Sequence, residues 1–235
     1  MKLSVIIPVF NEKNTIKQVI DLVNEVEINK EIIVVDDSST DGTKDVLSNL
    51  NLPNVRTIFH EKNMGKGAAI RTAIKYITGD MVIIQDADME YDPQDYYKLI
   101  QPIMEGKAEV VYGTRFHKNL IFILWHKLRD FIVAFTFTAG VLFLNILTDV
   151  LYRQRITDEA TCYKVFKAEV IKGLNLKCNR FEFCPEVTAK VAKKGYKIYE
   201  VPISFRPRGV SEGKKINWKD GMQAIWTLIK YRFVD

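Results

Sequence analysis

Short apolar strands alternate with amphipathic helices over the first 115 residues, and this alternation constrains the fold more than any other feature of the chain. Leu3–Val9 is a β-branched apolar run of the kind that is buried on both faces of a parallel sheet. Thr15–Val26 follows with apolar residues at helical spacing. Further strands are predicted at Glu31–Val35, Val55–Phe59, Met81–Ile84 and Val110–Tyr112, and helices near Gly67–Ile77 and Gln94–Met104. We therefore expect an α/β fold, with a mostly parallel sheet flanked by helices.

Two carboxylates follow the strand Met81–Ile84 directly. Ligands of open α/β sheets bind at the carboxyl ends of the strands, so polar residues at these positions are candidate site residues. Asp86 and Asp88 can hold one hard cation, Mg²⁺ or Mn²⁺, and leave coordination positions open for phosphate oxygens. Glu90 adds a nearby oxygen. An Asp-x-Asp sequence is common in ordinary turns, and its place at the end of the fourth predicted strand favours a metal site here.

Three other turns carry candidate nucleotide contacts. Pro8–Glu12 ends the first strand and can cradle a nucleotide, and Asp37 ends the second, where a carboxylate can accept hydrogen bonds from a ribose or a base. Helix capping is the alternative role for the second turn. Gly65 and Gly67 are typical of a helix start, and Lys66 between them is a candidate diphosphate contact.

Charge divides the chain into an acidic and a basic half. Residues 1–115 hold 13 Lys and Arg against 18 Asp and Glu, whereas residues 116–235 hold 21 against 11. An acidic half suits a metal ion, and a basic half suits phosphate or anionic lipid; a solvated surface is the alternative. The three cysteines are odd in number and lack a CxxC spacing, which favours a reducing cytosol over a disulfide framework or a zinc site.

Phe131–Thr148 is a run of 18 residues without a charge. As a helix it would be about 27 Å long, marginal for the roughly 30 Å hydrocarbon core of a bilayer. Three interpretations are open: membrane-interface helices together with Asn119–Leu128, core helices, or a membrane span. A span would put the two halves of one site on opposite sides of the bilayer, so we set it aside.

The C-terminal part returns to mixed elements. Helices are predicted at Ala168–Leu174 and Glu186–Lys194 and a strand at Lys197–Val201, followed by a basic loop over Phe205–Ile216. The final helix is amphipathic, with Trp218, Met222, Ile225, Trp226 and Ile229 on its apolar side. A basic helix of this kind commonly lies on a membrane surface. We expect one catalytic domain built from residues 1–115 (donor and metal), 116–156 (interface helices) and 157–235 (acceptor side).

Eight stretches, in this order, resemble the family 2 glycosyltransferases of the GT-A fold, and among them the polyprenol-phosphate (dolichol-phosphate) mannose synthases. They are Val5–Glu12, Val34–Thr43, Asn63–Ala69, Gln85–Pro93, Gly113–Arg115, Thr157–Phe166, Phe181–Glu186 and Glu200–Gly213. The resemblance spans almost the whole chain. It is highly specific for the superfamily and less specific for the substrate.

The resemblance implies roles for individual residues. The donor nucleotide would be held by Pro8, Val9, Asn11, Glu12, Asp37, Lys66 and Asp86. The metal ligands would be Asp86, Asp88 and Glu90. The acceptor phosphate would meet Arg115, Arg129, Arg206 and Arg208. The catalytic residues would be Arg115, Arg129, Asp88 and Asp158.

The implied reaction is inverting transfer of a hexose, foremost mannose from GDP-mannose, onto polyprenyl or dolichyl phosphate. A lipid monophosphate is anionic at pH 7 and needs placement and charge compensation rather than a general base. UDP-glucose is the alternative donor, and a glycan hydroxyl the alternative acceptor, for which Asp158 or Glu159 could act as base. A non-catalytic membrane adaptor is a third interpretation.

Two departures from the family pattern matter. Cys162-Tyr163-Lys164 replaces a Gly-aromatic pattern, and we expect Lys164 to be solvated. The chain also ends at Asp235 without the C-terminal transmembrane helices of many relatives. We therefore expect the protein at the cytoplasmic face of a membrane, held by its interface helices or by a membrane-anchoring partner subunit, with no nucleic-acid partner.

Overall fold

The computed structural model describes residues 1–116, 131–207 and 218–234, and side chains in the second range from residue 139 onward. Arg129, Arg208 and Asn119–Leu128 lie outside the described residues, so their expected roles stay predictions.

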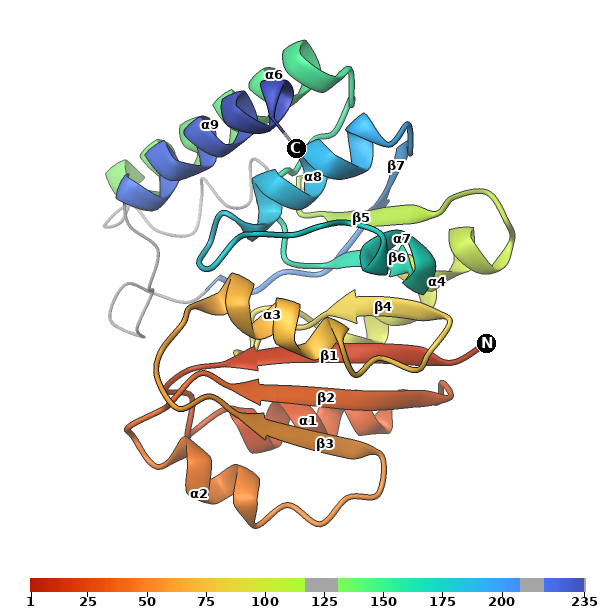
Figure 1. Cartoon of the computed structure of the whole chain (residues 1–235), viewed down its shortest axis with the longest axis vertical. Coiled ribbons are helices and arrows are strands. Elements are labelled where there is room, and N and C mark those ends of the chain that lie inside the picture. The colour runs from red at the N-terminus through yellow and green to blue at the C-terminus, as the bar shows by residue number, and fades with distance from the viewer. Residues whose placement is uncertain (117–130, 208–217, 235) are drawn as a thin grey trace.

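Seven strands form one mixed sheet in the order β3-β2-β1-β4-β6-β5-β7 (Figure 1). The strands are β1 (Leu3–Val9), β2 (Lys30–Asp36), β3 (Val55–Phe59), β4 (Met81–Ile84), β5 (Val110–Thr114), β6 (Lys164–Lys167) and β7 (Ile198–Pro202). All neighbouring pairs are parallel except those of β6, which runs antiparallel to β4 and β5. The predicted mostly parallel architecture is confirmed, and one sheet takes strands from both the N-terminal and the C-terminal parts of the chain.

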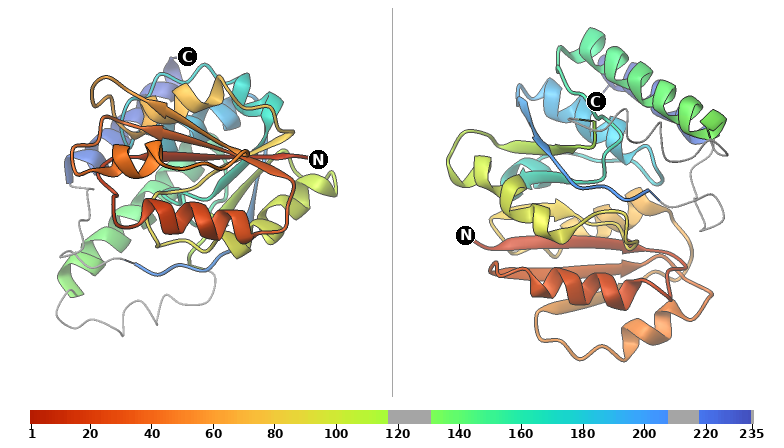
Figure 2. Two further views of the ribbon diagram at one scale, coloured as in Figure 1. Left: turned by 90° about the horizontal axis from the view of Figure 1, so that it is seen from below. Right: turned by 180° about the vertical axis from the view of Figure 1, so that it is seen from behind.

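Helices cover both faces of the sheet, with α3 and α8 on one face and α1 and α4 on the other (Figures 1 and 2). The helices are α1 (Ile16–Glu25), α2 (Thr43–Ser48), α3 (Lys66–Ile74), α4 (Tyr96–Met104), α6 (Phe131–Tyr152), α7 (Ala168–Lys172), α8 (Phe183–Lys193) and α9 (Trp218–Phe233), with a short 3₁₀ helix η1 at Pro93–Asp95. The helix predicted from Glu186 begins at Phe183, because Pro185 lies in the first turn, where its missing N–H has no intrahelical partner to lose.

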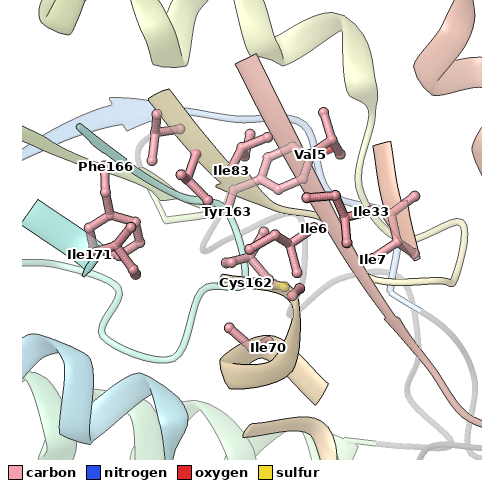
Figure 3. Packing of buried hydrophobic residues seen from close by; sticks show 14 of the residues in the cluster. Val5, Ile6, Ile7, Ile33, Ile70, Ile83, Cys162, Tyr163, Phe166 and Ile171 are labelled. Atoms are coloured by element: carbon pink, nitrogen blue, oxygen red, sulfur yellow. The ribbon is translucent and has the colours of Figure 1, made fainter. Parts of the chain in front are cut away.

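The core lies between the central strands and the covering helices (Figure 3). Val5, Ile6 and Ile83 are fully buried, as the β-branched runs predicted. Burying one such side chain contributes about 1.5–3 kcal/mol. The central strands therefore form a rigid platform, and the turns at their carboxyl ends are held in place by it.

β6 was not predicted, since its short sequence has a lysine at each end. The expectation that Lys164 is solvated was wrong, because the side chain is 0% exposed. Its Nζ donates to the Glu159 carbonyl oxygen at 2.7 Å and lies 3.8 Å from the centroid of the Tyr112 ring. A buried ammonium group requires such partners to offset its desolvation.

α6 is partly packed and partly exposed. It contains the uncharged run and continues to Tyr152, and it lies beside α9 (Figure 1), where Leu144 packs with Ala224 and Leu228. Its outer residue Ile146 is 64% exposed. Among the described residues, no helix combines the length and the apolar character needed to cross a membrane.

α9 turns much of its apolar side outward. Trp218, Met222, Trp226, Ile229 and Phe233 recur every three or four residues, and all five are exposed. We call these residues the α9 stripe. Ile225, also predicted on the apolar side of this helix, is partly buried and packs against the cluster of Leu144, Ala224 and Leu228.

Candidate active site

The turn after β1 carries four residues of the expected donor site. Pro8 and Val9 are the buried last residues of the strand, and Asn11 and Glu12 follow it. Asn11 has a φ of 52°, in the left-handed region that asparagine tolerates better than most residues. Its Oδ1 accepts a hydrogen bond from Thr40 N at 2.8 Å. The turns after β1 and β2 are therefore tied to each other.

Asp37 lies after β2 and is 3% exposed. Its Oδ1 accepts from Met64 N at 2.8 Å and lies 2.7 Å from His60 Nδ1, and its Oδ2 accepts from Gly65 N at 2.6 Å. The carboxylate thus fixes the loop that leads into α3, and its contact with a nucleotide stays a prediction. Sequence reasoning missed His60, because a single histidine after a strand carries no spacing signal.

The two glycines at the start of α3 are required by a close backbone approach. Gly65 has a φ of 93°, and a Cβ at this position would lie 2.3 Å from the Asn179 carbonyl oxygen. Gly67 N and Ala68 N donate to the carbonyl oxygens of Arg180 and Asn179 at 3.1 and 3.0 Å. The interpretation as helix-start glycines is confirmed. The N–H groups of Gly67 and Ala68 are therefore already bonded within the protein.

Lys66 and Asp86, both expected at the donor diphosphate, form an ion pair with each other. Burial opposes the charge on Lys66, but the Asp86 carboxylate outweighs it and raises the lysine pKa well above its ordinary value. Lys66 Nζ also lies 3.5 Å from Cys162 Sγ. The ammonium group therefore already supplies positive charge beside the carboxylate at the end of β4.

The three carboxylates expected as metal ligands do not converge. Asp88 Oδ1 accepts a hydrogen bond from Glu90 N at 3.1 Å, which shapes the turn, while Asp86 faces Lys66. Within residues 1–116, 131–207 and 218–234, no three His, Cys, Asp or Glu side chains gather as a metal site. Mg²⁺ commonly takes only one or two protein carboxylates and completes its shell with water and substrate phosphates. The Asp86 and Asp88 oxygens fit that chemistry once a diphosphate is present.

The segment after β7, expected on the acceptor side, bonds to the Asp-x-Asp loop. Tyr91 and Phe205 form an isolated antiparallel β-bridge, and Arg206 N donates to the Glu90 carbonyl oxygen at 2.8 Å. On the opposite flank, Thr15 Oγ1 donates to the Ala87 carbonyl oxygen at 2.9 Å. Thr15 and Arg206, which are far apart in the sequence, therefore both bond to the backbone of the Asp-x-Asp loop. The bond from Arg206 brings this residue beside the loop.

The buried side chain of Gln85 also bonds to the backbone of the Asp-x-Asp loop. It is 0% exposed, and its Oε1 accepts from the hydroxyls of Tyr96 and Tyr163 at 2.6 and 2.7 Å. Its Nε2 donates to the Asp86 carbonyl oxygen at 3.0 Å. Sequence reasoning missed this buried polar cluster, because its members come from three separate segments.

Arg115 and Asp158 form a bidentate ion pair next to the Phe205 ring. Arg115 Nε and Nη2 lie 2.7 Å from the two carboxylate oxygens, and Arg115 N donates to Oδ2 at 3.0 Å. The guanidinium carbon lies 5.0 Å from the centroid of the Phe205 ring. Two of the four expected catalytic residues are thus brought together, with Asp158 as the partner of the arginine.

Glu159, the other candidate base, faces inward. It is 1% exposed, its Oε1 accepts from Thr188 Oγ1 at 3.3 Å, and its N donates to Asn145 Oδ1 at 2.9 Å. Burial raises the pKa of its carboxyl group. A carboxylate in this position has no access to an incoming hydroxyl, and Asp158 is held by Arg115.

A cleft of about 500 Å³ opens beside these turns. Its walls include Asn11 and Glu12 from the turn after β1, Met89 from the Asp-x-Asp loop, and Arg206. The cleft therefore joins residues expected at the donor with one expected at the acceptor phosphate.

The profile of Glycosyl transferase family 2 matches residues 4–174 of the chain. The protein belongs to glycosyltransferase family 2. The match covers β2 to β6 and all of β1 but its first residue, together with the Asp-x-Asp loop.

Two relatives of this glycosyltransferase have dolichol phosphate or dolichyl phosphate in their names. It is 30% identical over 243 residues to a UDP-N-acetylglucosamine–dolichyl-phosphate N-acetylglucosaminyltransferase of Methanococcus voltae, covering 95% of this chain and 93% of the relative. It is 29% identical over 236 residues to a dolichol-phosphate mannosyltransferase of Pyrococcus furiosus. That alignment covers 98% of this chain and 64% of the relative.

Solved structures share the fold of this glycosyltransferase. Glucosyl-3-phosphoglycerate synthase from Mycobacterium tuberculosis, in complex with Mn²⁺, uridine diphosphate and phosphoglyceric acid, superposes with a TM-score of 0.72 at 19% identity. The comparison covers 100% of this chain and 79% of the synthase. The expected GT-A fold is confirmed.

Proposed function

We propose that this glycosyltransferase transfers a hexose from a nucleotide-diphosphate sugar onto a polyprenyl or dolichyl phosphate. The observation that carries the proposal is the bond from Arg206 N to the Glu90 carbonyl oxygen, which holds an arginine-bearing segment against the Asp-x-Asp loop. Donor diphosphate and acceptor phosphate would then meet between Lys66 and Arg206. Arginine suits this role because its planar guanidinium donates two parallel hydrogen bonds to a phosphate.

Transfer of the sugar to a lipid phosphate requires no proton transfer. A phosphate oxygen of the lipid attacks the anomeric carbon from the face opposite the leaving group, a new C–O bond forms, and the bond to the diphosphate oxygen breaks. The electron pair of the broken bond stays on the diphosphate, and the sugar configuration inverts. Lys66 and Arg206 would bind and orient the two phosphates, so placement and charge compensation supply most of the rate.

Asp86 and Asp88, with Glu90 nearby, would hold Mg²⁺ or Mn²⁺. When bound, the metal would supply further neutralisation of the leaving diphosphate. Because Lys66 already pairs with Asp86, the metal would share that carboxylate with the ammonium group.

Acceptor chemistry favours a phosphate over a glycan hydroxyl. A hydroxyl acceptor needs a general base, and both candidates, Asp158 and Glu159, are buried and bonded to other groups. A lipid phosphate needs no base. The glycan acceptor therefore remains the second candidate only.

Contact with a membrane surface follows from a lipid acceptor. The α9 stripe exposes Trp218 and Trp226, which are 75% and 64% exposed, and Phe143 and Ile146 of the neighbouring α6 are 51% and 64% exposed. Exposed apolar residues in such a group mark an interaction site. Lys219 and Lys230 on α9 add positive charge that attracts anionic lipids. We propose that α6 and α9 rest on the cytoplasmic face of a membrane.

A transfer assay with three labelled nucleotide sugars identifies the donor. Purified protein, Mn²⁺ and vesicles containing polyprenyl phosphate are incubated with radiolabelled GDP-mannose, UDP-glucose or UDP-N-acetylglucosamine, and label is counted in the organic phase. We propose GDP-mannose as the first donor to test. Organic-phase label that mild acid releases as free sugar supports the proposed acceptor, and its donor names the nucleotide. Label that stays in water-soluble glycan with every donor would refute the lipid acceptor.

A further inference from the structure

Glu200, near the middle of β7, holds the turn that carries Asp158. Its two carboxylate oxygens each lie 2.9 Å from Thr157 N, its Oε2 accepts from Thr157 Oγ1 at 3.0 Å, and its Oε1 accepts from Asp158 N at 3.2 Å. Two backbone N–H groups and one hydroxyl therefore converge on one side chain. The mechanism proposed above does not use this residue.

The turn held by Glu200 contacts Arg115 and the end of β5. Asp158 binds the guanidinium group of Arg115 at 2.7 Å through both oxygens, and Thr157 Oγ1 lies 2.7 Å from Thr114 Oγ1 at the end of β5. β5 and β7 are parallel neighbours, with Glu200 opposite Tyr112, and Arg115 directly follows the last residue of β5. Each link in this series is a hydrogen bond or an ion pair.

We propose that Glu200 is a positioning residue, which sets the Arg115 guanidinium for the acceptor phosphate through Thr157 and Asp158. The inference rests on the proposed function, with Arg115 joining Arg206 at the acceptor phosphate as the sequence predicts. Glu200 touches neither substrate in this scheme. It fixes the backbone at Asp158, and Asp158 in turn fixes the plane of the guanidinium group.

A carboxylate suits this task better than a neutral side chain. Hydrogen bonds from backbone N–H groups to an ionised carboxylate are shorter and roughly twice as strong as neutral ones. A glutamine at this position would keep one acceptor oxygen but present an NH₂ group to the N–H donors of Thr157 and Asp158. The turn would lose its anchor while β7 keeps its length and pairing.

The test compares Glu200→Gln with Tyr199→Phe, a substitution at a neighbouring residue of β7 that is 48% exposed. Both are assayed for transfer to polyprenyl phosphate in vesicles, for nucleotide-sugar KM and for Tm. Misplacement of a phosphate-binding group by about 1 Å can lower the rate by about 100-fold. We expect Glu200→Gln to lower kcat/KM for the lipid phosphate by about 10- to 100-fold, with the donor KM changed less than about twofold. Tyr199→Phe should match the wild type.

A double-mutant cycle separates positioning from a general structural role. Arg115→Lys keeps the charge but removes the bidentate geometry. If Glu200 acts through Arg115, adding Glu200→Gln to Arg115→Lys should cost little further activity, because contacting members of one network are non-additive. Losses that add on a logarithmic scale would overturn the positioning role. A wild-type enzyme without lipid product would instead overturn the proposed function, and the inference with it.

Discussion

The guanidinium group of Arg115 and the carboxylate of Asp158 face each other in parallel, with Nε and Nη2 both 2.7 Å from a carboxylate oxygen. The side chains are 6% and 0% exposed. Removing one partner of a buried pair leaves an uncompensated charge, whereas removing both can be nearly neutral.

Asp158→Asn should therefore lower the free energy of unfolding by about 3 kcal/mol and reduce sugar transfer. Urea unfolding and the vesicle assay measure the two effects. The double variant Arg115→Met/Asp158→Leu is the control: it should recover much of the stability and none of the activity. Full activity of Asp158→Asn would contradict the pairing as a functional feature.

Asp88→Ala should abolish turnover and leave the fold intact, because Asp88 lies in a turn at the end of β4 and outside the apolar core. Turnover with and without Mn²⁺, together with the circular dichroism spectrum, measures this. Asp21→Ala, at a surface ion pair with Lys17 on α1, is the matched control and should keep full activity. Wild-type activity that persists in metal-free buffer would refute the assignment of Asp86 and Asp88 to a metal.

Replacing Trp218 and Trp226 together by serine should weaken binding to anionic vesicles by at least about tenfold, since each exposed tryptophan contributes apolar area to the interface. Co-sedimentation with vesicles measures the change, and Tm should stay within a few degrees. Met104→Ser, which removes a residue that is 57% exposed on α4, is the control for losing exposed apolar surface elsewhere. Equal vesicle binding by all three proteins would show that the α9 stripe faces something other than lipid.

Glu31 should stabilise the fold at neutral pH and lose this effect in acid. Burial opposes its ionisation, but hydrogen bonds from Ser4, Thr78 and Lys2 outweigh burial and lower its pKa from 4.5 to about 2. A lowered pKa in the folded state means that the stabilisation is complete above about pH 4.5 and disappears as the pH falls toward 2.

Urea unfolding of Glu31→Gln at pH 7 and pH 3 tests this. The variant should be less stable than the wild type at pH 7, with a smaller difference at pH 3. Glu61→Gln, at an exposed position, is the control for the loss of one negative charge. A gap between wild type and Glu31→Gln that is the same at both pH values would contradict the hydrogen-bonded carboxylate.

The α/β fold could be predicted from the sequence because it follows from local patterns. β-branched runs such as Leu3–Val9 are typical of buried strands, and carboxylates that directly follow a strand of a parallel sheet lie at the edge where the strands end. This pattern predicts that Asp86, Asp88 and Asp37 lie at one edge of the sheet. The glycines at 65 and 67 were likewise predicted to mark a helix start, and the structure adds the positive φ of Gly65 and the close approach of Arg180 to Gly67.

Only the tertiary structure decided which of these groups bond to one another. Lys66 pairs with Asp86, Asp158 with Arg115 and Glu200 with Thr157, and the partners are 20, 43 and 43 residues apart. The inward position of Lys164 and the outward position of the α9 stripe likewise depend on Tyr112, Glu159 and α6 as neighbours. Periodicity reports which residues share a face of one element, whereas a buried charge is stable only beside partners that other elements supply, and the packing of those elements is not written in any local pattern.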